Sequence, residues 1–182
     1  PIEMGFAVRH PERIKRLVIF NTAAFLSREI PLSLKLCRLP GFGPITIRMF
    51  NAFARTATYW ACKKPERMAA KVRAGYLKPY DSFANRVATL RFVQDIPMNQ
   101  DSPSYPVLQN IEKKLNLFCT HPVKIIWGAQ DFVFNDNFLN RWKEIFPQAE
   151  VHQIEDAGHY VVEDAHEHIL PLMKEFFYKN PI

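Results

Sequence analysis

Short apolar runs of strand length alternate with helical stretches along much of this chain, and this alternation limits its possible folds more than any other feature. Residues 16–23 (RLVIFNTA) and 122–131 (PVKIIWGAQD) are almost continuously apolar, which is typical of parallel strands covered on both faces. Residues 149–159 (AEVHQIEDAGH) predict a third strand and its loop. Helices are expected over residues 106–119, 137–146 and 167–179. This order predicts parallel βαβ units in a doubly wound sheet, so the expected fold class is α/β.

Residues 24–105 interrupt the alternation and are called the cap segment here. They contain proline-rich turns, several short helical stretches and many aromatic side chains. Because a connection between two strands of one sheet is normally much shorter, this insertion predicts a helical subdomain or lid. The expected organisation is therefore an α/β core formed by 1–23 and 106–182, with the helical cap segment inserted into it.

An acid and a histidine follow two of the predicted strands. Asp131 comes directly after the second strand, and His159 follows the third. The carboxyl ends of adjacent parallel strands meet at one edge of a sheet, where the loops carry much of a protein's chemistry. A carboxylate that accepts the imidazole Nδ1–H fixes the tautomer and stabilises the imidazolium, so the pair suits a catalytic base and its orienting acid. The alternative is that each residue caps the next helix. Asp is a common N-cap and His is not, so the two positions together favour catalysis.

The charge of the chain does not indicate a nucleic-acid partner. The net charge of +6 comes from Lys and Arg residues that are dispersed among acidic residues. The densest basic run, residues 63–73 (KKPERMAAKVR), has the apolar positions of an amphipathic helix. A solvated helix face therefore explains the run better than a nucleic-acid footprint.

The cysteines and histidines indicate neither a disulfide framework nor a metal site. Cys37, Cys62 and Cys119 are widely spaced, which fits a reducing cytoplasm, and His166 and His168 point to different sides of a helix. No Gly-rich phosphate loop suggests a nucleotide, so we expect no cofactor. No apolar run reaches the roughly 18 residues of a membrane span, and no signal segment opens the chain. We expect a soluble, cytoplasmic protein.

Three segments resemble a known family. PERIKRLVIFNTAAF, PVKIIWGAQDFVF and AGHYVVEDA occur in this order, with the cap segment between the first two. Together they resemble the C-terminal part of the haloalkane dehalogenase-like α/β-hydrolases, whose relatives include epoxide hydrolases and the β-lactone decarboxylases of bacterial olefin synthesis. FNAFARTATYW, GYLKPYDSFANR and RFVQDIPM in the cap segment are similar to the lactone-cleaving branch.

The resemblance implies an order of nucleophile, acid and histidine along the chain. His159 matches the base, and the acid of the family follows either of two strands. Asn21 occupies the first of these positions and cannot serve as a carboxylate, so the resemblance assigns the acid to Asp131. The family nucleophile is usually an aspartate that forms an alkyl or acyl ester, which water activated by the histidine then cleaves.

The nucleophile itself does not match any residue of the chain. Residues 1–182 contain no G-x-S-x-G and no equivalent Asp elbow. The opening helix resembles the one that follows the elbow, so we expect the nucleophile just before Pro1 and the chain to be the latter half of an enzyme, inactive by itself. A serine in that position would instead make an esterase.

The expected substrate is small or lipid-like and apolar: a haloalkane, an epoxide or a β-lactone. Trp60, Phe53 and Phe50 could line its pocket, and Asn51 could donate a hydrogen bond there. The resemblance implies that a cap tryptophan helps to hold a leaving halide. Packing inside the cap segment is the alternative role for all these aromatic residues.

A three-stranded parallel sheet would also expose the edge of its first strand. Natural proteins normally cover such edges, because unpaired strands aggregate. We therefore expect a missing N-terminal half, a swapped copy or a second chain to pair there. A non-catalytic fragment that binds a partner through this open edge is the competing hypothesis.

Overall fold

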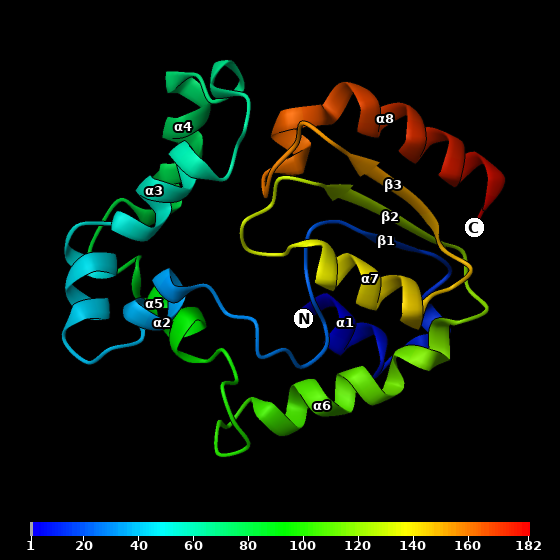
Figure 1. The fold of residues 1–182 in the computed structure, drawn as a ribbon, viewed down its shortest axis with the longest axis horizontal. Helices are drawn as coiled ribbons and strands as arrows, with labels where there is room; N and C mark the ends of the chain where they lie inside the picture. Colours follow the sequence, from blue (N-terminus) through cyan, green and yellow to red (C-terminus); the bar gives the residue numbers. More distant parts are fainter. Residues whose placement is uncertain (1) are drawn as a thin grey trace.

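The computed structural model describes residues 2–182, and within them three parallel strands form one sheet (Figure 1). The strands are β1 (Leu17–Ile19), β2 (Val123–Gly128) and β3 (Glu150–Ile154), in the order β1-β2-β3. Leu17 lies opposite Val123, and Ile125 lies opposite Val151. Every residue of β2 is buried, as expected for a continuous apolar run in a central parallel strand. The predicted α/β class is confirmed.

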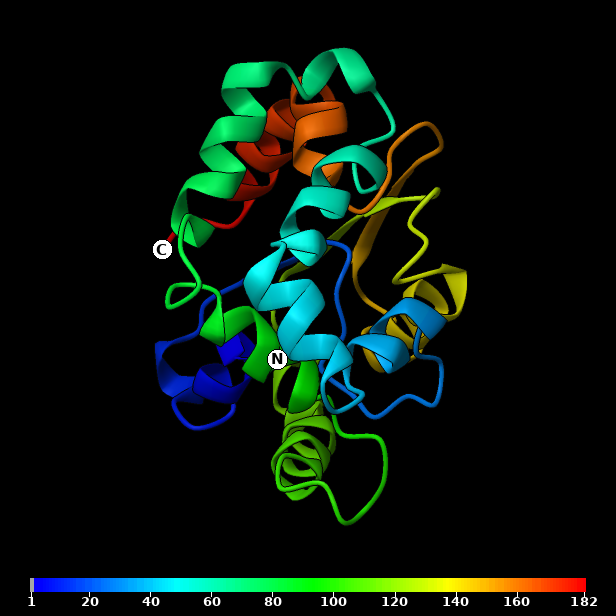
Figure 2. The same ribbon diagram turned by 90° about the vertical axis from the view of Figure 1, so that its left-hand side faces the viewer.

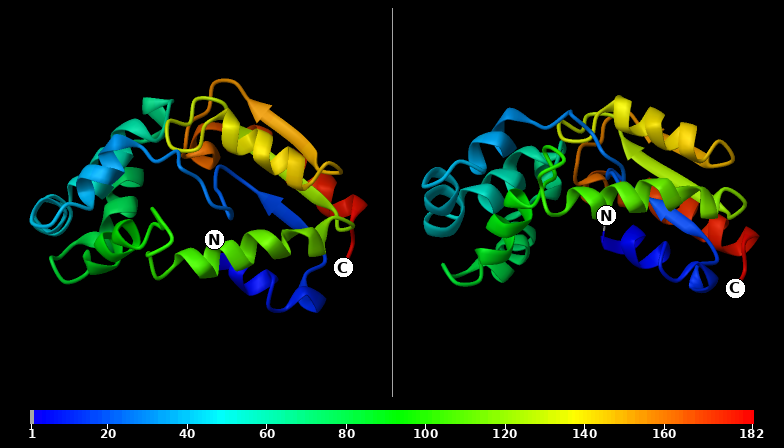
Figure 3. Two further views of the ribbon diagram at one scale, coloured as in Figure 1. Left: turned by 60° about the horizontal axis from the view of Figure 1, so that its bottom comes forward. Right: turned by 90° about the horizontal axis from the view of Figure 1, so that it is seen from below.

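Helices cover both faces of the sheet. Successive side chains of β2 point to opposite faces, so this strand packs against helices on both sides. Ile126 packs against α8 (Val161–Lys179) on one face. Ile125 and Trp127 face α7 (Asp136–Ile145) on the other. The cluster on this second face also includes residues of α6 (Tyr105–Lys114), the 3₁₀ turn η5 (Leu115–Phe118) and α1 (Ile2–Ala7). Figure 3 shows α1 and α6 beneath the sheet, and a 3₁₀ turn, η1 (Pro11–Arg13), links α1 to β1.

The cap segment is helical and lies beyond the end of the sheet toward which β2 and β3 point (Figures 1 and 2). Its α-helices are α2 (Leu32–Cys37), α3 (Ala52–Trp60), α4 (Ala70–Leu77) and α5 (Val87–Gln94). Three shorter turns join them: the π-helical η2 (Pro44–Met49) and the 3₁₀ turns η3 (Pro65–Arg67) and η4 (Lys78–Tyr80). Ile47, Leu90 and Val93 form a small apolar cluster within the cap segment. The carboxyl ends of the strands therefore face the cap segment.

Two predicted helices differ from the structure. Residues 63–73 do not form one amphipathic helix, because the chain makes the turn η3 at Pro65 and leaves helical geometry at Met68, whose side chain is buried. α8 begins at Val161 rather than 167, and Ala165 interrupts it with non-helical angles (φ −144°, ψ 29°). Packing of Met68 in the interior outweighs the local helical pattern of residues 63–73.

β1 pairs with β2 alone among the residues that the structure describes. The backbone N–H of Leu17 donates to the carbonyl oxygen of Pro122 at 2.9 Å. In a parallel pair, alternate residues direct their backbone groups to the same neighbour, so Val18 directs its N–H and C=O away from β2. The pairing of a further segment or chain with this edge of β1 stays a prediction. No helix between residues 2 and 182 is long and apolar enough to cross a membrane.

Candidate active site

Asp131 and His159 meet at the carboxyl ends of β2 and β3. Nδ1 of His159 lies 2.8 Å from Oδ2 of Asp131. The Asp131 side chain is fully buried, whereas 28% of the His159 side chain is exposed. Because Nδ1 is held by the carboxylate, Nε2 is the ring nitrogen that can exchange a proton with a substrate or water. The geometry is that of a base oriented by an acid.

The turn after β2 holds the Asp131 carboxylate in a single orientation. The backbone N–H groups of Val133 and Phe134 donate to Oδ1 at 2.7 and 3.1 Å. Oδ2 is thereby left to face the imidazole. Neither Asp131 nor His159 caps a helix: Asn135 is the N-cap of α7, and α8 follows Tyr160, which makes no side-chain cap. The capping alternative therefore does not explain either residue.

Asn21, which follows β1, completes the polar cluster. Its Nδ2 donates to Oδ2 of Asp131 at 2.9 Å and to the carbonyl oxygen of Gly128 at 3.1 Å. Its Oδ1 accepts the N–H of Gly128 at 2.8 Å. The buried amide thus joins the ends of β1 and β2 and stabilises the carboxylate charge. From the sequence, Asn21 stands out only as a residue that cannot serve as the acid. Its position at the end of a strand, however, indicates a role in supporting the acid at the neighbouring strand end.

The loops that follow β2 and β3 are in close contact behind the histidine. A Cβ at Gly128 would lie 2.4 Å from the carbonyl oxygen of Gly158 and 2.7 Å from that of Ala157. A side chain at position 128 would therefore separate the two loops. The N–H of Gln130 also donates to the Ala157 carbonyl oxygen at 2.9 Å. The separation of Asp131 and His159 is thus set by backbone contacts.

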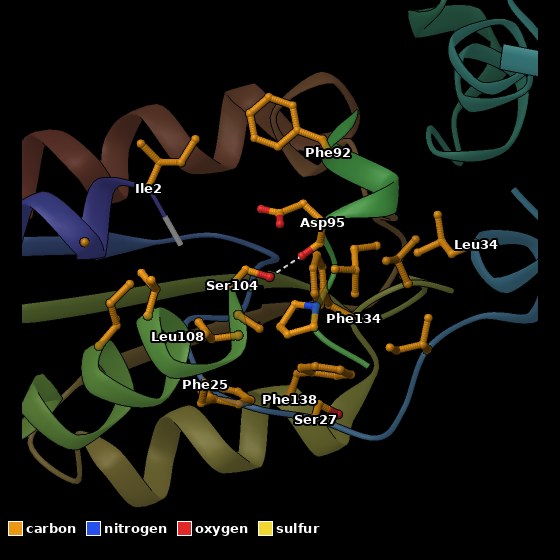
Figure 4. A pocket seen from close by; sticks show the side chains of 18 of the residues that line it. Ile2, Phe25, Ser27, Leu34, Phe92, Asp95, Ser104, Leu108, Phe134 and Phe138 are labelled. Carbon is orange, nitrogen blue, oxygen red and sulfur yellow. Dashed lines mark hydrogen bonds between the residues drawn. The ribbon is translucent and has the colours of Figure 1, made fainter. Parts of the chain in front are cut away.

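An apolar cavity of about 650 Å³ opens between the core and the cap segment, beside this site (Figure 4). Val133 and Phe134 of the Asp131 turn line it, and the Phe134 ring lies 5.7 Å from the His159 ring. The other walls come from α1, α6, α7 and the two ends of the cap segment, with Ile2, Leu108, Phe138, Leu34 and Phe92 among them. Six polar or charged residues also line the cavity: Arg9, His10, Ser27, Glu29, Asp95 and Ser104. The Ser104 hydroxyl donates to the carbonyl oxygen of Asp95. The size and lining of the cavity are those of a site for an apolar ligand.

The four residues that the sequence suggested for the pocket lie elsewhere. Trp60 is 67% exposed and Phe50 63% exposed. Phe53 packs against the apolar cluster of the cap segment. Asn51 is buried in a left-handed conformation (φ 52°), and its Nδ2 donates to the carbonyl oxygen of Tyr80 at 3.1 Å. None of the four lines the cavity beside the Asp131 turn.

No group of three or more His, Cys, Asp or Glu side chains within residues 2–182 is arranged to hold a metal ion. His152 lies beside Lys124 on the sheet, 3.3 Å from its Nζ. His166 lies beside Glu167 on α8. The neighbours of His152 and His166 are thus charged side chains: Lys124 in the sheet and Glu167 on α8.

Comparison with known proteins gives relatives in both sequence and structure. A family model described as "alpha/beta hydrolase fold" matches residues 54–165, which include Asp131 and His159. A cis-3-alkyl-4-alkyloxetan-2-one decarboxylase of Shewanella oneidensis is 44% identical over 96% of this chain and 56% of its own length. Its counterpart from Xanthomonas campestris pv. campestris is 39% identical over 100% of this chain and 61% of its own length. The chain thus spans less than two thirds of each curated relative.

Among solved structures, a loop variant of a haloalkane dehalogenase from Bradyrhizobium elkanii superposes with a TM-score of 0.84 at 17% identity, over 98% of this chain and 63% of the other. This likeness shows that the two proteins share a fold. The family model covers more than half of the chain and both loops of the site. The chain therefore belongs to the alpha/beta hydrolase fold family.

Proposed function

We propose that this chain supplies the base and its orienting acid to an enzyme that cleaves a small or lipid-like apolar substrate through a covalent ester. The contact of 2.8 Å between His159 Nδ1 and Asp131 Oδ2 carries the proposal. A buried carboxylate in this position holds the proton on Nδ1, so Nε2 is able to accept another. The apolar cavity beside the Phe134 ring supplies the space for a substrate.

The proposed reaction has two steps, and the chain acts in the second. A nucleophile from outside residues 1–182 attacks an electrophilic carbon of the substrate and forms an ester, while the ring carbon–oxygen bond (or, in a haloalkane, the carbon–halogen bond) breaks and its electron pair stays on the oxygen or halide. A water molecule then loses a proton to Nε2 of His159 and adds to the ester carbonyl. The tetrahedral intermediate collapses, the leaving oxygen takes the proton from the imidazolium, and the nucleophile is regenerated. Asp131 stabilises the imidazolium while it carries the proton.

The curated relatives favour a β-lactone over a haloalkane or an epoxide. The two decarboxylases, whose names specify an oxetan-2-one with two alkyl groups, are 44% and 39% identical to this chain. The dehalogenase shares only its fold at 17% identity. A cavity with mainly apolar walls also suits an alkyl chain better than a polar substrate. We therefore propose a cis-dialkyl β-lactone as the substrate.

The experiment compares wild type with His159→Gln, in a form of the protein that carries the nucleophile, during incubation with a cis-3,4-dialkyl β-lactone. Wild type should turn over repeatedly, and analysis of its products separates decarboxylation to an alkene from hydrolysis to a β-hydroxy acid. The variant should stop at the ester, which intact mass spectrometry detects as a stable mass increase. Peptide mapping of the adduct then tells an aspartate nucleophile from the serine of an esterase.

Asp131→Asn provides the second arm of this experiment. It preserves the shape of the site but favours the wrong imidazole tautomer, so turnover should fall by about 10⁴, by analogy with orienting acids in other triads. Repeated turnover by His159→Gln at the wild-type rate would refute the proposal.

Pairing through the open edge of β1 is the second candidate function. It is supported by the absence of a second partner strand for β1 within residues 2–182. Lack of any adduct or turnover, together with stable binding of another chain at this edge, would favour it.

A further inference from the structure

The loop that presents His159 is joined to the cap segment by one buried carboxylate. Asp164, in the first turn of α8, is fully buried. Its Oδ1 accepts the Cys62 thiol at 2.9 Å and the backbone N–H groups of Lys63 and Lys64 at 2.8 and 2.9 Å. Its Oδ2 accepts the N–H of Gly158 at 2.8 Å. Three of these donors belong to the cap segment, and the fourth belongs to the residue directly before the candidate base.

The backbones on the two sides of this carboxylate are in direct contact. A Cβ at Gly158 would lie 2.8 Å from the carbonyl oxygen of Ala61 and 2.9 Å from Cγ of Lys63. The same Ala61 oxygen accepts the N–H of Tyr160 at 2.8 Å. The cap segment therefore touches both neighbours of His159 in sequence, and glycine is required at 158 for this approach.

The charge on Asp164 is maintained by its hydrogen bonds. Burial alone raises the pKa of a carboxyl group, but the bonds from Cys62 and from the backbone of Gly158, Lys63 and Lys64 bring the pKa of Asp164 below its ordinary value. Burial, followed by the bond to Asp164, raises the pKa of the Cys62 thiol to about 12, so the thiol stays a donor. Separating the two segments would leave a buried charge without its donors, which is strongly unfavourable.

Weaker contacts surround the same junction. Lys64 pairs with Asp156 at 2.8 Å, and the Tyr76 hydroxyl donates to Glu163 at 2.9 Å. The Tyr76 and Tyr160 rings stack with centroids 4.9 Å apart. The Asp156 side chain is 64% exposed, so its ion pair contributes little compared with the buried carboxylate.

We propose that Asp164 is a positioning residue for His159: it ties the cap segment to the loop of the base and thereby sets where the imidazole stands. The proposal rests on the function proposed above for His159, but its contacts exist whatever the substrate. It follows that the cap segment does not open at this junction while Asp164 is charged and bonded. The position of the base therefore depends on a residue that does not touch the substrate.

The test replaces Asp164 with Asn in the full chain, and the control is Asp156→Asn. The amide has one oxygen, so it can serve Cys62 and Lys64 or it can serve Gly158, but not both. The Lys63 N–H, which lies 2.8 Å from Oδ1 and 3.0 Å from Oδ2, can bond in either orientation. The NH₂ group of the amide then faces the N–H donors that the other carboxylate oxygen accepts in the wild type. Hydrogen exchange of the amides in 61–64 or 157–160 should accelerate about ten- to a hundred-fold, the effect expected for a lost hydrogen bond to a buried charge. The downfield Nδ1 proton of His159 should broaden or shift in the NMR spectrum. The control should match wild type in both measurements.

Gly158→Ala tests the same junction with Asp164 intact, in case the first variant does not fold. Its methyl group has to displace the Ala61 carbonyl or the Lys63 side chain, so the His159 proton should change as it does in Asp164→Asn. The matched control is Gly75→Ala in α4, where nothing lies within 4 Å of the added carbon. Wild-type exchange and an unchanged His159 proton in both Asp164→Asn and Gly158→Ala would overturn the proposal.

Kinetics with the β-lactone, measured in the form of the protein that carries the nucleophile, separate this proposal from the proposed function. If Asp164 positions the base, kcat should fall about a hundred-fold with little change in KM, as expected when a catalytic group is displaced by about 1 Å. Loss of exchange protection without any wild-type turnover would support the positioning role and contradict the proposed function. Normal wild-type turnover with an unaffected Asp164→Asn variant would do the reverse.

Discussion

Asp131 illustrates how a buried charge is accommodated near a reactive group. His159, Asn21 and the N–H groups of Val133 and Phe134 all contact its two oxygens. The fully buried side chain thus has a hydrogen-bond partner at each of its two oxygens. The orientation of the imidazole thus depends on side chains from three different loops.

We expect Asn21→Ala to weaken both the site and the sheet. The substitution removes one hydrogen bond to Asp131 and two to Gly128. Asp131 keeps its bond to His159 and the Gly128 carbonyl keeps the N–H of Asp131, but the Gly128 N–H loses the Asn21 oxygen. The free energy of unfolding, measured by urea denaturation, should fall by about 1–3 kcal/mol. Asn21→Asp is the informative comparison, because two adjacent carboxylates repel and one of them should then bind a proton. An unchanged urea midpoint for Asn21→Ala would show that the amide has no structural role.

The sequence was informative about Asp131 and His159 because strand ends of a parallel sheet share one edge. The structure brings the two side chains to 2.8 Å. It was uninformative about Trp60 and Phe50, which are largely exposed. In a cap of short helices, the face that each aromatic residue presents depends on how the helices pack, and no periodic pattern in the sequence records that. Asp164 was missed for a similar reason, since its donors in the cap segment are about a hundred residues away in the chain.

β2 and β3 carry a second buried charge, distant from the candidate site. Lys124 is 1% exposed, and its Nζ pairs with Glu150 at 2.8 Å and contacts His152 at 3.3 Å. Burial, followed by the Lys124 charge, lowers the pKa of His152, while Glu150 and Glu175 oppose this. The folded protein therefore holds the imidazole in its neutral form more strongly than the unfolded chain does.

This pair of strands predicts a pH dependence of stability. As the pH falls below the ordinary histidine pKa of 6.5, the unfolded chain binds a proton at position 152 before the folded protein does. Unfolding is therefore favoured increasingly as the pH falls from 6.5 to the lower folded-state pKa, and the loss is complete below it. His152→Gln should show a shallower decline in urea stability over this range. Parallel pH profiles for the variant and wild type would contradict the prediction.

At the level of helices and strands, the sequence was most reliable for the continuously apolar β2 and for the amphipathic α7. β2 lies within the predicted run 122–131, and α7 almost coincides with the predicted 137–146. The run 63–73 was predicted wrongly as a single helix, because its pattern did not reveal that Met68 would be buried against other parts of the fold. The early start of α8 was missed, and nothing in the sequence marks the interruption at Ala165, because alanine is a strong helix former.

Within residues 2–182, the outer edge of β1 has no partner strand. The N–H and C=O groups of Val18 point away from β2, and Ile2 and Phe6 of α1 are substantially exposed. Curated relatives are longer than this chain, which spans 56% and 61% of two of them. We propose that another polypeptide segment pairs with β1 in the active protein, because open parallel edges are prone to non-specific association.

We therefore expect the chain by itself to self-associate at high concentration, in a manner that depends on the edge of β1. Val18→Pro removes the outward N–H without affecting the bonds to β2, so light scattering should show reduced self-association. Leu17→Pro is the contrasting variant, since Leu17 N–H bonds to Pro122 in the existing sheet, and it should destabilise the fold instead. Unaltered self-association of Val18→Pro would rule out pairing through this edge.

The proposed acid, the proposed base and the proposed positioning residue all lie between 131 and 164, and close contacts at Gly128 and Gly158 hold their loops together. This stretch depends on Asn21 and on residues 62–64, which bond to Asp131 and Asp164. All these parts would therefore be inherited together during evolution, while the segment that provides the attacking atom diverges. The same acid and base could then serve enzymes with different reactions. New chemistry would arise when the segment that carries the nucleophile changes, while the acid and the histidine stay as they are.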